Sequence, residues 1–185
     1  VERDGRYEMD LDALEAALDT RGDLASRIPI EAQVTTLDLA HTNDASAIVR
    51  VGRAATMVSD TSAPVERCVV THAERIQGSR AAPLRTEDVV RRAVAVACGG
   101  PIICDRHYAE TVATLLKAAS YREFKVVDGD KRGFRGFTGR KHHFASMAAH
   151  DQENRFVALR AFAHGQRLHV VDCKDGRALL SELAN

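Results

Sequence analysis

Two aspartates, Asp38 and Asp105, each lie near the end of a short apolar run with the composition of a β-strand. The runs cover residues 34–39 and 101–105. A carboxylate fits poorly inside a packed sheet, so each is expected at a sheet edge or end, facing a cation or a partner molecule. For one aspartate alone, a strand-end cap or a turn residue is the ordinary explanation. Two carboxylates on neighbouring strands have the chemistry to hold divalent metal ions.

The elements that position these acids follow from hydrophobic periodicity and turn residues. Alternation with period two predicts strands, and apolar residues three and four apart predict helices. Thr86 is predicted to be the N-cap of the first core helix. In chain order we expect strands at residues 34–39, 46–53 and 65–76, and then a helix that follows Thr86 and is stopped by residues 99–101. A strand at 102–105, a helix carrying Val112 and Leu116, and a strand at 124–127 come next.

This order, β-β-β-α-β-α-β, predicts which strands are neighbours. A right-handed crossover after the third strand returns the chain parallel to the first strand and beside it, so Asp38 and Asp105 are expected to be adjacent. A divalent cation or a basic partner would keep both carboxylates ionised. Two Mg²⁺ or Mn²⁺ ions, ~3.5–4 Å apart, would clamp the attacking water and the leaving oxygen of a phosphodiester. Glu74, near the end of the third strand, is a further candidate ligand.

The remaining segments complete one domain. Residues 9–20 predict a short amphipathic helix, which we interpret as a lead-in or linker covering residues 1–32. The main domain is expected at residues 33–185. Its last elements are a helix at residues 144–163, a strand at residues 168–171 and a helix beginning at residue 179.

A basic loop is predicted at residues 128–143. It combines glycines and phenylalanines with Lys131, Arg132, Arg135, Arg140 and Lys141, and residues 131–150 contain no acid. Such a loop can neutralise phosphates, and its glycines let the backbone approach a ligand closely. The alternative is a solvated surface loop. The absence of acids favours contact with DNA or RNA.

Composition limits the other possibilities. Lys and Arg (26) balance Asp and Glu (26), so no global field attracts the chain to nucleic acid or membrane. No apolar run approaches the ~20 residues of a membrane span. We expect a soluble, cytoplasmic protein. Phosphate-binding glycine motifs of nucleotide-driven motors are absent from the sequence.

Three stretches of the sequence together resemble the nuclease domain of phage and prophage large terminase subunits, within the ribonuclease H-like superfamily. They are residues 37–49, 82–90 and 103–110. The resemblance implies an α/β fold with a mixed sheet, three antiparallel strands followed by parallel strands, and helices on both faces. It also implies that Asp38 and Asp105 are the first two metal-binding acids of a domain that cleaves double-stranded DNA. An ATPase motor and a portal protein would be its partners, and the host cytoplasm its location.

The resemblance leaves the third acid of the family unassigned. That acid lies on a C-terminal helix, beyond a segment resembling residues 165–171, and the sequence ends at Asn185 before such a helix. Three explanations stay open. The domain is truncated, or the third ligand comes from elsewhere in the chain, with Asp172 and Glu74 as candidates, or the protein is an inactive relative. Two alternatives to a nuclease stay open. One is a catalytically incomplete DNA-binding or assembly module, and the other is an α/β enzyme acting on a small phosphorylated substrate with one Mg²⁺.

Overall fold

The computed structural model describes nine stretches of the chain. They are residues 11–19, 29–39, 45–56, 64–79, 81–105, 108–121, 124–128, 142–146 and 159–184. For residues 105, 124–128, 142–146 and 184, only the backbone is described.

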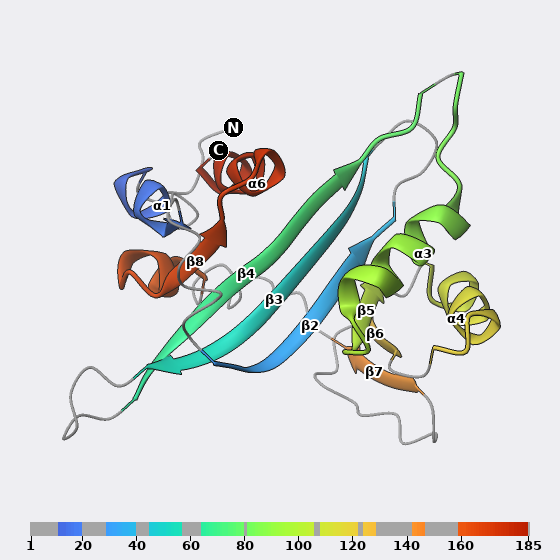
Figure 1. The fold of residues 1–185 in the computed structure, drawn as a ribbon, viewed down its shortest axis with the longest axis horizontal. Coiled ribbons are helices and arrows are strands. Elements are labelled where there is room, and N and C mark those ends of the chain that lie inside the picture. Colours follow the sequence, from blue (N-terminus) through green and yellow to red (C-terminus); the bar gives the residue numbers. More distant parts are fainter. Residues whose placement is uncertain are drawn as a thin grey trace. The chain divides into compact units, whose positions relative to one another are not determined.

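The described residues form helices and strands, which Figure 1 shows in order of sequence colour. Residues 159–164 are also helical. The elements are α1 (Leu11–Ala17), β1 (Leu18–Asp19), β2 (Ile30–Asp38), β3 (Ser46–Thr56), β4 (Val65–Ile76), α3 (Thr86–Ala97), β5 (Ile102–Asp105), α4 (Ala109–Ala118), β6 (Phe124–Asp128), β7 (His142–Ser146), β8 (Leu168–Val171) and α6 (Lys174–Ala184).

The chain divides into two compact units. Unit 1 comprises Val1–Gln33, Val51–Ala73 and Glu153–Asn185, and unit 2 comprises Val34–Arg50 and Glu74–Gln152. Each of the long strands β2, β3 and β4 contributes residues to both units.

Unit 2 contains a mixed sheet with the strand order β4-β3-β2-β5-β6-β7. The arrows of β2 and β4 point one way and that of β3 the other, so these three strands are antiparallel neighbours (Figure 1). From β2 onward the pairing changes: β5 runs parallel to β2, β6 to β5 and β7 to β6. This confirms the predicted order from the first strand to β6, and the predicted adjacency of β2 and β5.

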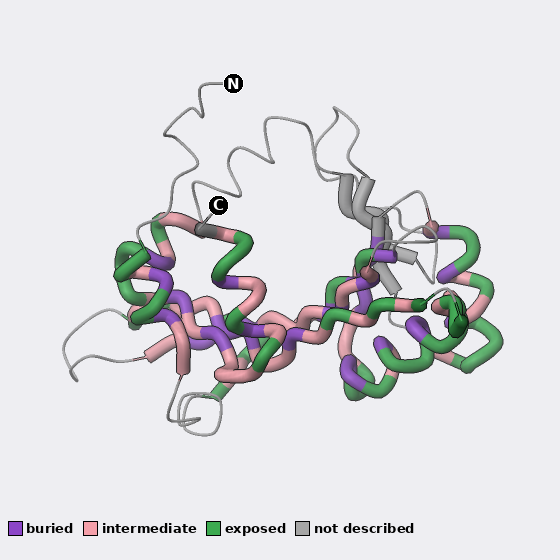
Figure 2. Tube along the Cα trace, turned by 90° about the horizontal axis from the view of Figure 1, so that it is seen from above, coloured by how far each residue is buried: buried purple, intermediate pink, exposed green. Residues whose placement is uncertain are grey.

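Helices α3 and α4 pack on one face of the unit 2 sheet. The core they form with the strands includes Leu37, Ile48 and Ile102 from the sheet. On α3, Val89, Val90, Ala93 and Ala97 are buried. On α4, Val112 and Leu116 are buried, with Val112 at 0% exposure. Buried residues recur along these strands and on the inner sides of the helices (Figure 2). Helices on the second face stay a prediction.

Unit 1 has the strand order β1-β8-β4-β3-β2, in which β1 and β4 both run parallel to β8. Helix α1 packs against α6 and β8, and Leu14 and Ala17 are buried. Residues that the sequence assigned to a lead-in are thus part of unit 1. The domain boundary at residue 33 stays a prediction.

The predicted helix at residues 144–163 is wrong at its start, because His142–Ser146 forms β7. Phe124 through Asp128 on β6 pair in register with these five residues. Backbone hydrogen bonds to β6 therefore decide the conformation, over a local sequence without β-branched residues. Helical structure is present at residues 159–164.

The first residues of two helices, α3 and α6, differ from expectation. Thr86 is not the N-cap of α3, because the backbone N–H groups of Asp88 and Val89 already bond to the Arg85 carbonyl. Arg85 is therefore the N-cap, without a side-chain cap. Helix α6 begins at Lys174, earlier than the predicted residue 179.

Candidate functional site

Asp38 and Asp105 come to neighbouring positions on parallel strands of unit 2. The register pairs Thr36 with Ile103 and Leu37 with Cys104. Asp38 and Asp105 are the next residues on β2 and β5, where each strand ends. Adjacent strands lie about 4.8 Å apart. The backbone therefore brings the two predicted metal-binding positions side by side.

The surroundings of Asp38 explain why a carboxylate is tolerated there. Leu37 and Leu39 are buried in the core beneath α3 and α4, whereas Asp38 between them is exposed. Successive strand residues point to opposite faces of a sheet. Asp38 is thus on the face opposite the core, where an ionised carboxylate avoids the desolvation of the interior.

Glu74 makes an ion pair with a residue of α3. Arg92 Nε donates to both carboxylate oxygens of Glu74, at 2.8 Å to Oε2 and 3.1 Å to Oε1. The Glu74 side chain is 24% exposed and that of Arg92 53%. This candidate ligand already has a cationic partner, which compensates its charge without a metal ion.

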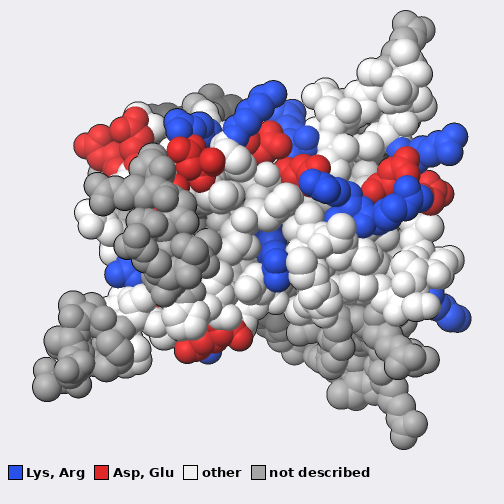
Figure 3. All heavy atoms as spheres, viewed as in Figure 1, with Lys and Arg blue, Asp and Glu red and all other residues white. Residues whose placement is uncertain are grey.

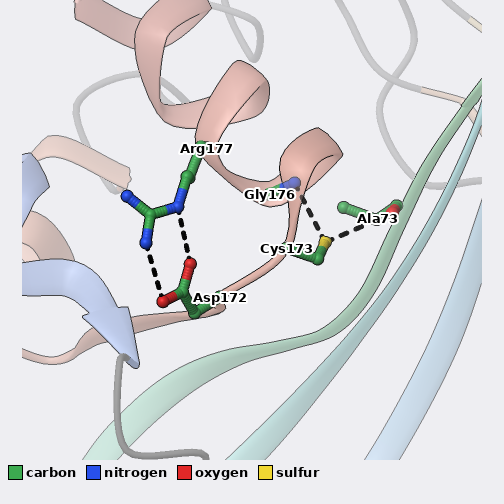
Figure 4. Close-up of polar contacts among 5 residues, drawn as sticks. All are labelled: Ala73, Asp172, Cys173, Gly176 and Arg177. Carbon is green, nitrogen blue, oxygen red and sulfur yellow. Dashed lines mark hydrogen bonds and ion pairs between the residues drawn. The ribbon is translucent and has the colours of Figure 1, made fainter.

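Asp172 lies in unit 1, whereas Asp38 and Asp105 belong to unit 2. Arg177 donates two hydrogen bonds to the Asp172 carboxylate, from Nε to Oδ1 at 2.7 Å and from Nη2 to Oδ2 at 2.8 Å (Figure 4). Such a bidentate pair is the strong form of carboxylate recognition by arginine. Asp172 is therefore also neutralised by a basic side chain.

Cys173 shapes the same turn of unit 1. Its Sγ accepts the backbone N–H of Gly176 at 3.2 Å, and the thiol faces the Ala73 carbonyl oxygen at 3.8 Å (Figure 4). A Cβ at Gly176 would meet the Val171 carbonyl oxygen. Position 176, at the start of α6, therefore requires glycine, because a larger side chain has no room there.

The basic loop lies outside the described residues between 128 and 142. This holds for all five of its predicted phosphate-contacting residues, Lys131, Arg132, Arg135, Arg140 and Lys141. On the face seen in Figure 3, Lys and Arg lie interspersed with Asp and Glu. Exposed charges of the described residues form ion pairs, such as Arg91 with Asp88 at 3.0 Å.

The described part of the chain lacks two features. No group of three or more His, Cys, Asp or Glu side chains converges there in a way that could hold a metal ion. Within the same ranges, no helix has the length and apolar content needed to cross a membrane.

One polar contact of unit 1 was missed by sequence reasoning. Arg67 Nη1 lies 2.9 Å from His169 Nε2, although the two residues are 102 positions apart in the chain. No local sequence pattern predicts this contact, because it depends on the pairing of β4 with β8. Nothing in the spacing of either residue suggests a partner.

Comparison of the chain with protein-family models, curated proteins and solved structures found no match.

Proposed function

We propose that unit 2 is a ribonuclease H-like, metal-dependent endonuclease domain that cleaves double-stranded DNA. The observation that carries the proposal is the parallel register of β2 and β5, which brings Asp38 and Asp105 to neighbouring strand ends. The strand order β4-β3-β2-β5-β6, antiparallel and then parallel, is the order expected of a ribonuclease H-like sheet.

The donor set fits a hard divalent cation. Carboxylate oxygens are the ligands preferred by Mg²⁺ and Mn²⁺, and two adjacent acids at a sheet end would share such ions. When bound, two ions would supply activation of water and stabilisation of the leaving oxygen. The chain itself would contribute the two carboxylates, and the basic residues between 131 and 141 would hold the phosphate backbone.

By resemblance, we infer that this domain belongs to a large terminase subunit. Its partners would be an ATPase motor and a portal protein. The proposal for these partners stands on the three resembling stretches, at residues 37–49, 82–90 and 103–110.

A plasmid-cleavage assay with Mn²⁺ tests the nuclease. Asp38→Asn and Asp105→Asn should each lower the rate by about 100-fold or more, because removing one group that stabilises transition-state charge costs about 10²–10³ in rate. Asp88→Asn is the matched control, since Asp88 is an exposed acid of the same unit. Cleavage that survives both site substitutions would contradict the two-acid site.

The Glu74–Arg92 ion pair favours a second candidate function, a DNA-binding or assembly module without catalysis. With Glu74 compensated by arginine, two of the three family acids have candidates among the described residues of unit 2. Such a module would bind plasmid in a mobility-shift assay and leave it uncut at any Mn²⁺ concentration. Neutralising Arg135, Arg140 and Lys141 together should weaken that binding in either case.

A further inference from the structure

We propose that the contact between Arg67 and His169 is an acid-sensitive lock that holds β8 and the following helix α6 in unit 1. Arg67 is on β4 and His169 on β8, two parallel neighbours whose register pairs Val69 with His169. Both side chains are partly buried.

The chemistry of the two side chains fixes the protonation state of the histidine. A guanidinium has only donors and stays protonated at all ordinary pH values. At 2.9 Å from Arg67 Nη1, His169 Nε2 must therefore accept the hydrogen bond. The ring is then neutral, with its proton on Nδ1. Protonation of Nε2 would remove the acceptor and bring two cations together.

Arg67 also joins the neighbouring segments to β8. Its Nε donates to Thr56 Oγ1 at 2.8 Å, at the end of β3, and its Nη1 donates to the Gln166 carbonyl at 3.3 Å, just before β8. One guanidinium thus contacts β3, β8 and the turn before β8. Repulsion from a charged His169 would disturb all three.

The charges around His169 act in both directions. Burial and the Arg67 charge lower the pKa of the ring, and Asp19 on the neighbouring strand β1 opposes them. Helix α1, which also packs against β8, carries the exposed acids Asp12 and Glu15. The net direction is downward, so the folded state favours neutral His169.

The sign of the pH dependence follows from linkage. A histidine in an unfolded chain titrates near pH 6.5, and His169 in the folded chain titrates at a lower pH. Above about pH 6.5 the stabilisation is fully present. As the pH falls from there through the folded pKa, the unfolded state takes up a proton first, and the stabilisation is lost.

Hydrogen exchange at residues 168–171 of the full chain tests the lock at pH 7.5 and 5.5, after correction for the intrinsic pH dependence of exchange. The opening equilibrium constant of β8 should rise on acidification by at most about tenfold, because pH 5.5 lies about one unit below the pKa of an unfolded histidine. In His169→Gln, which keeps an acceptor and cannot titrate, the rise should shrink. His164→Gln, at an exposed histidine of the same unit, is the control and should behave as wild type.

An equal rise in His169→Gln and wild type would overturn the proposal. If His169→Gln does not fold, an NMR titration of the histidine rings in the wild-type chain decides the question. The proposal requires one ring, assigned to His169, to take up its proton below pH 6.5. Titration of that ring at or above pH 6.5 would overturn it.

Discussion

The two units contain acids in the same kind of position but with different neighbours. Asp172 in unit 1 directly follows β8, and Asp38 in unit 2 ends β2. Arg177 donates hydrogen bonds to Asp172. Asp38 lies next to Asp105, the last residue of the neighbouring strand β5. An acid at a strand end is therefore not by itself a site. An acid that a basic side chain already compensates has less need of a cation.

The largest expected effect is on the rate of DNA cleavage, when Asp38 and Asp172 are each replaced by Asn in separate variants. Asp38→Asn should reduce Mn²⁺-dependent cleavage by about 100-fold or more. Asp172→Asn should leave it within about twofold of wild type, because Asp172 lies in unit 1 and pairs with Arg177. Parallel Mn²⁺ titrations followed by electron paramagnetic resonance would report binding. Equal losses of cleavage rate from Asp38→Asn and Asp172→Asn would contradict the proposed difference between the two acids.

A second comparison concerns glycines, Gly176 in unit 1 and Gly99 in unit 2. Gly176→Ala should destabilise the protein by about 2–3 kcal/mol, because the new Cβ would collide with the Val171 carbonyl oxygen. Gly99→Ala should cost about 1 kcal/mol, since it adds only backbone strain at φ +84° with nothing within 4 Å. Urea unfolding measures both changes. A Gly99 variant less stable than the Gly176 variant would contradict the steric argument.

The smallest expected effect tests the ion pair of unit 1. Arg177→Ala should lower the free energy of unfolding by about 1 kcal/mol or less, because the Arg177 side chain is 60% exposed and solvent screens the pair. Unfolding curves at low and high salt would show the difference shrinking with salt. A loss of several kcal/mol would mean that this pair organises the turn into α6.

Much of the unit 2 fold was predictable because its signals are local. Strands with alternating or continuous β-branched residues, such as residues 65–76 and 102–105, were confirmed, and crossover handedness then gave the adjacency of Asp38 and Asp105. β7 was missed because its strand conformation comes from pairing with β6. β1 was missed for a similar reason, since Leu18 and Asp19 leave the predicted helix to pair with β8.

The partners of individual side chains were less predictable than the strands. Glu74 of β4 and Arg92 of α3 are 18 positions apart and meet only in the folded chain. Arg67 reaches His169 only because β8 pairs with β4. Such pairs depend on packing between elements distant in sequence. Local periodicity therefore indicated where acids lie, and packing decided which of them are already neutralised.

The interleaving of the two units along the chain has a consequence for folding. Unit 1 is assembled from three separate stretches and unit 2 from two, so the chain passes between units within β2, β3 and β4. No single cut can release either unit as one continuous fragment. Each unit requires distant segments to meet before its sheet can close, which is typical of slow folding. Isolating unit 2 would therefore require two separate fragments that associate, Val34–Arg50 and Glu74–Gln152, and unit 1 would require three.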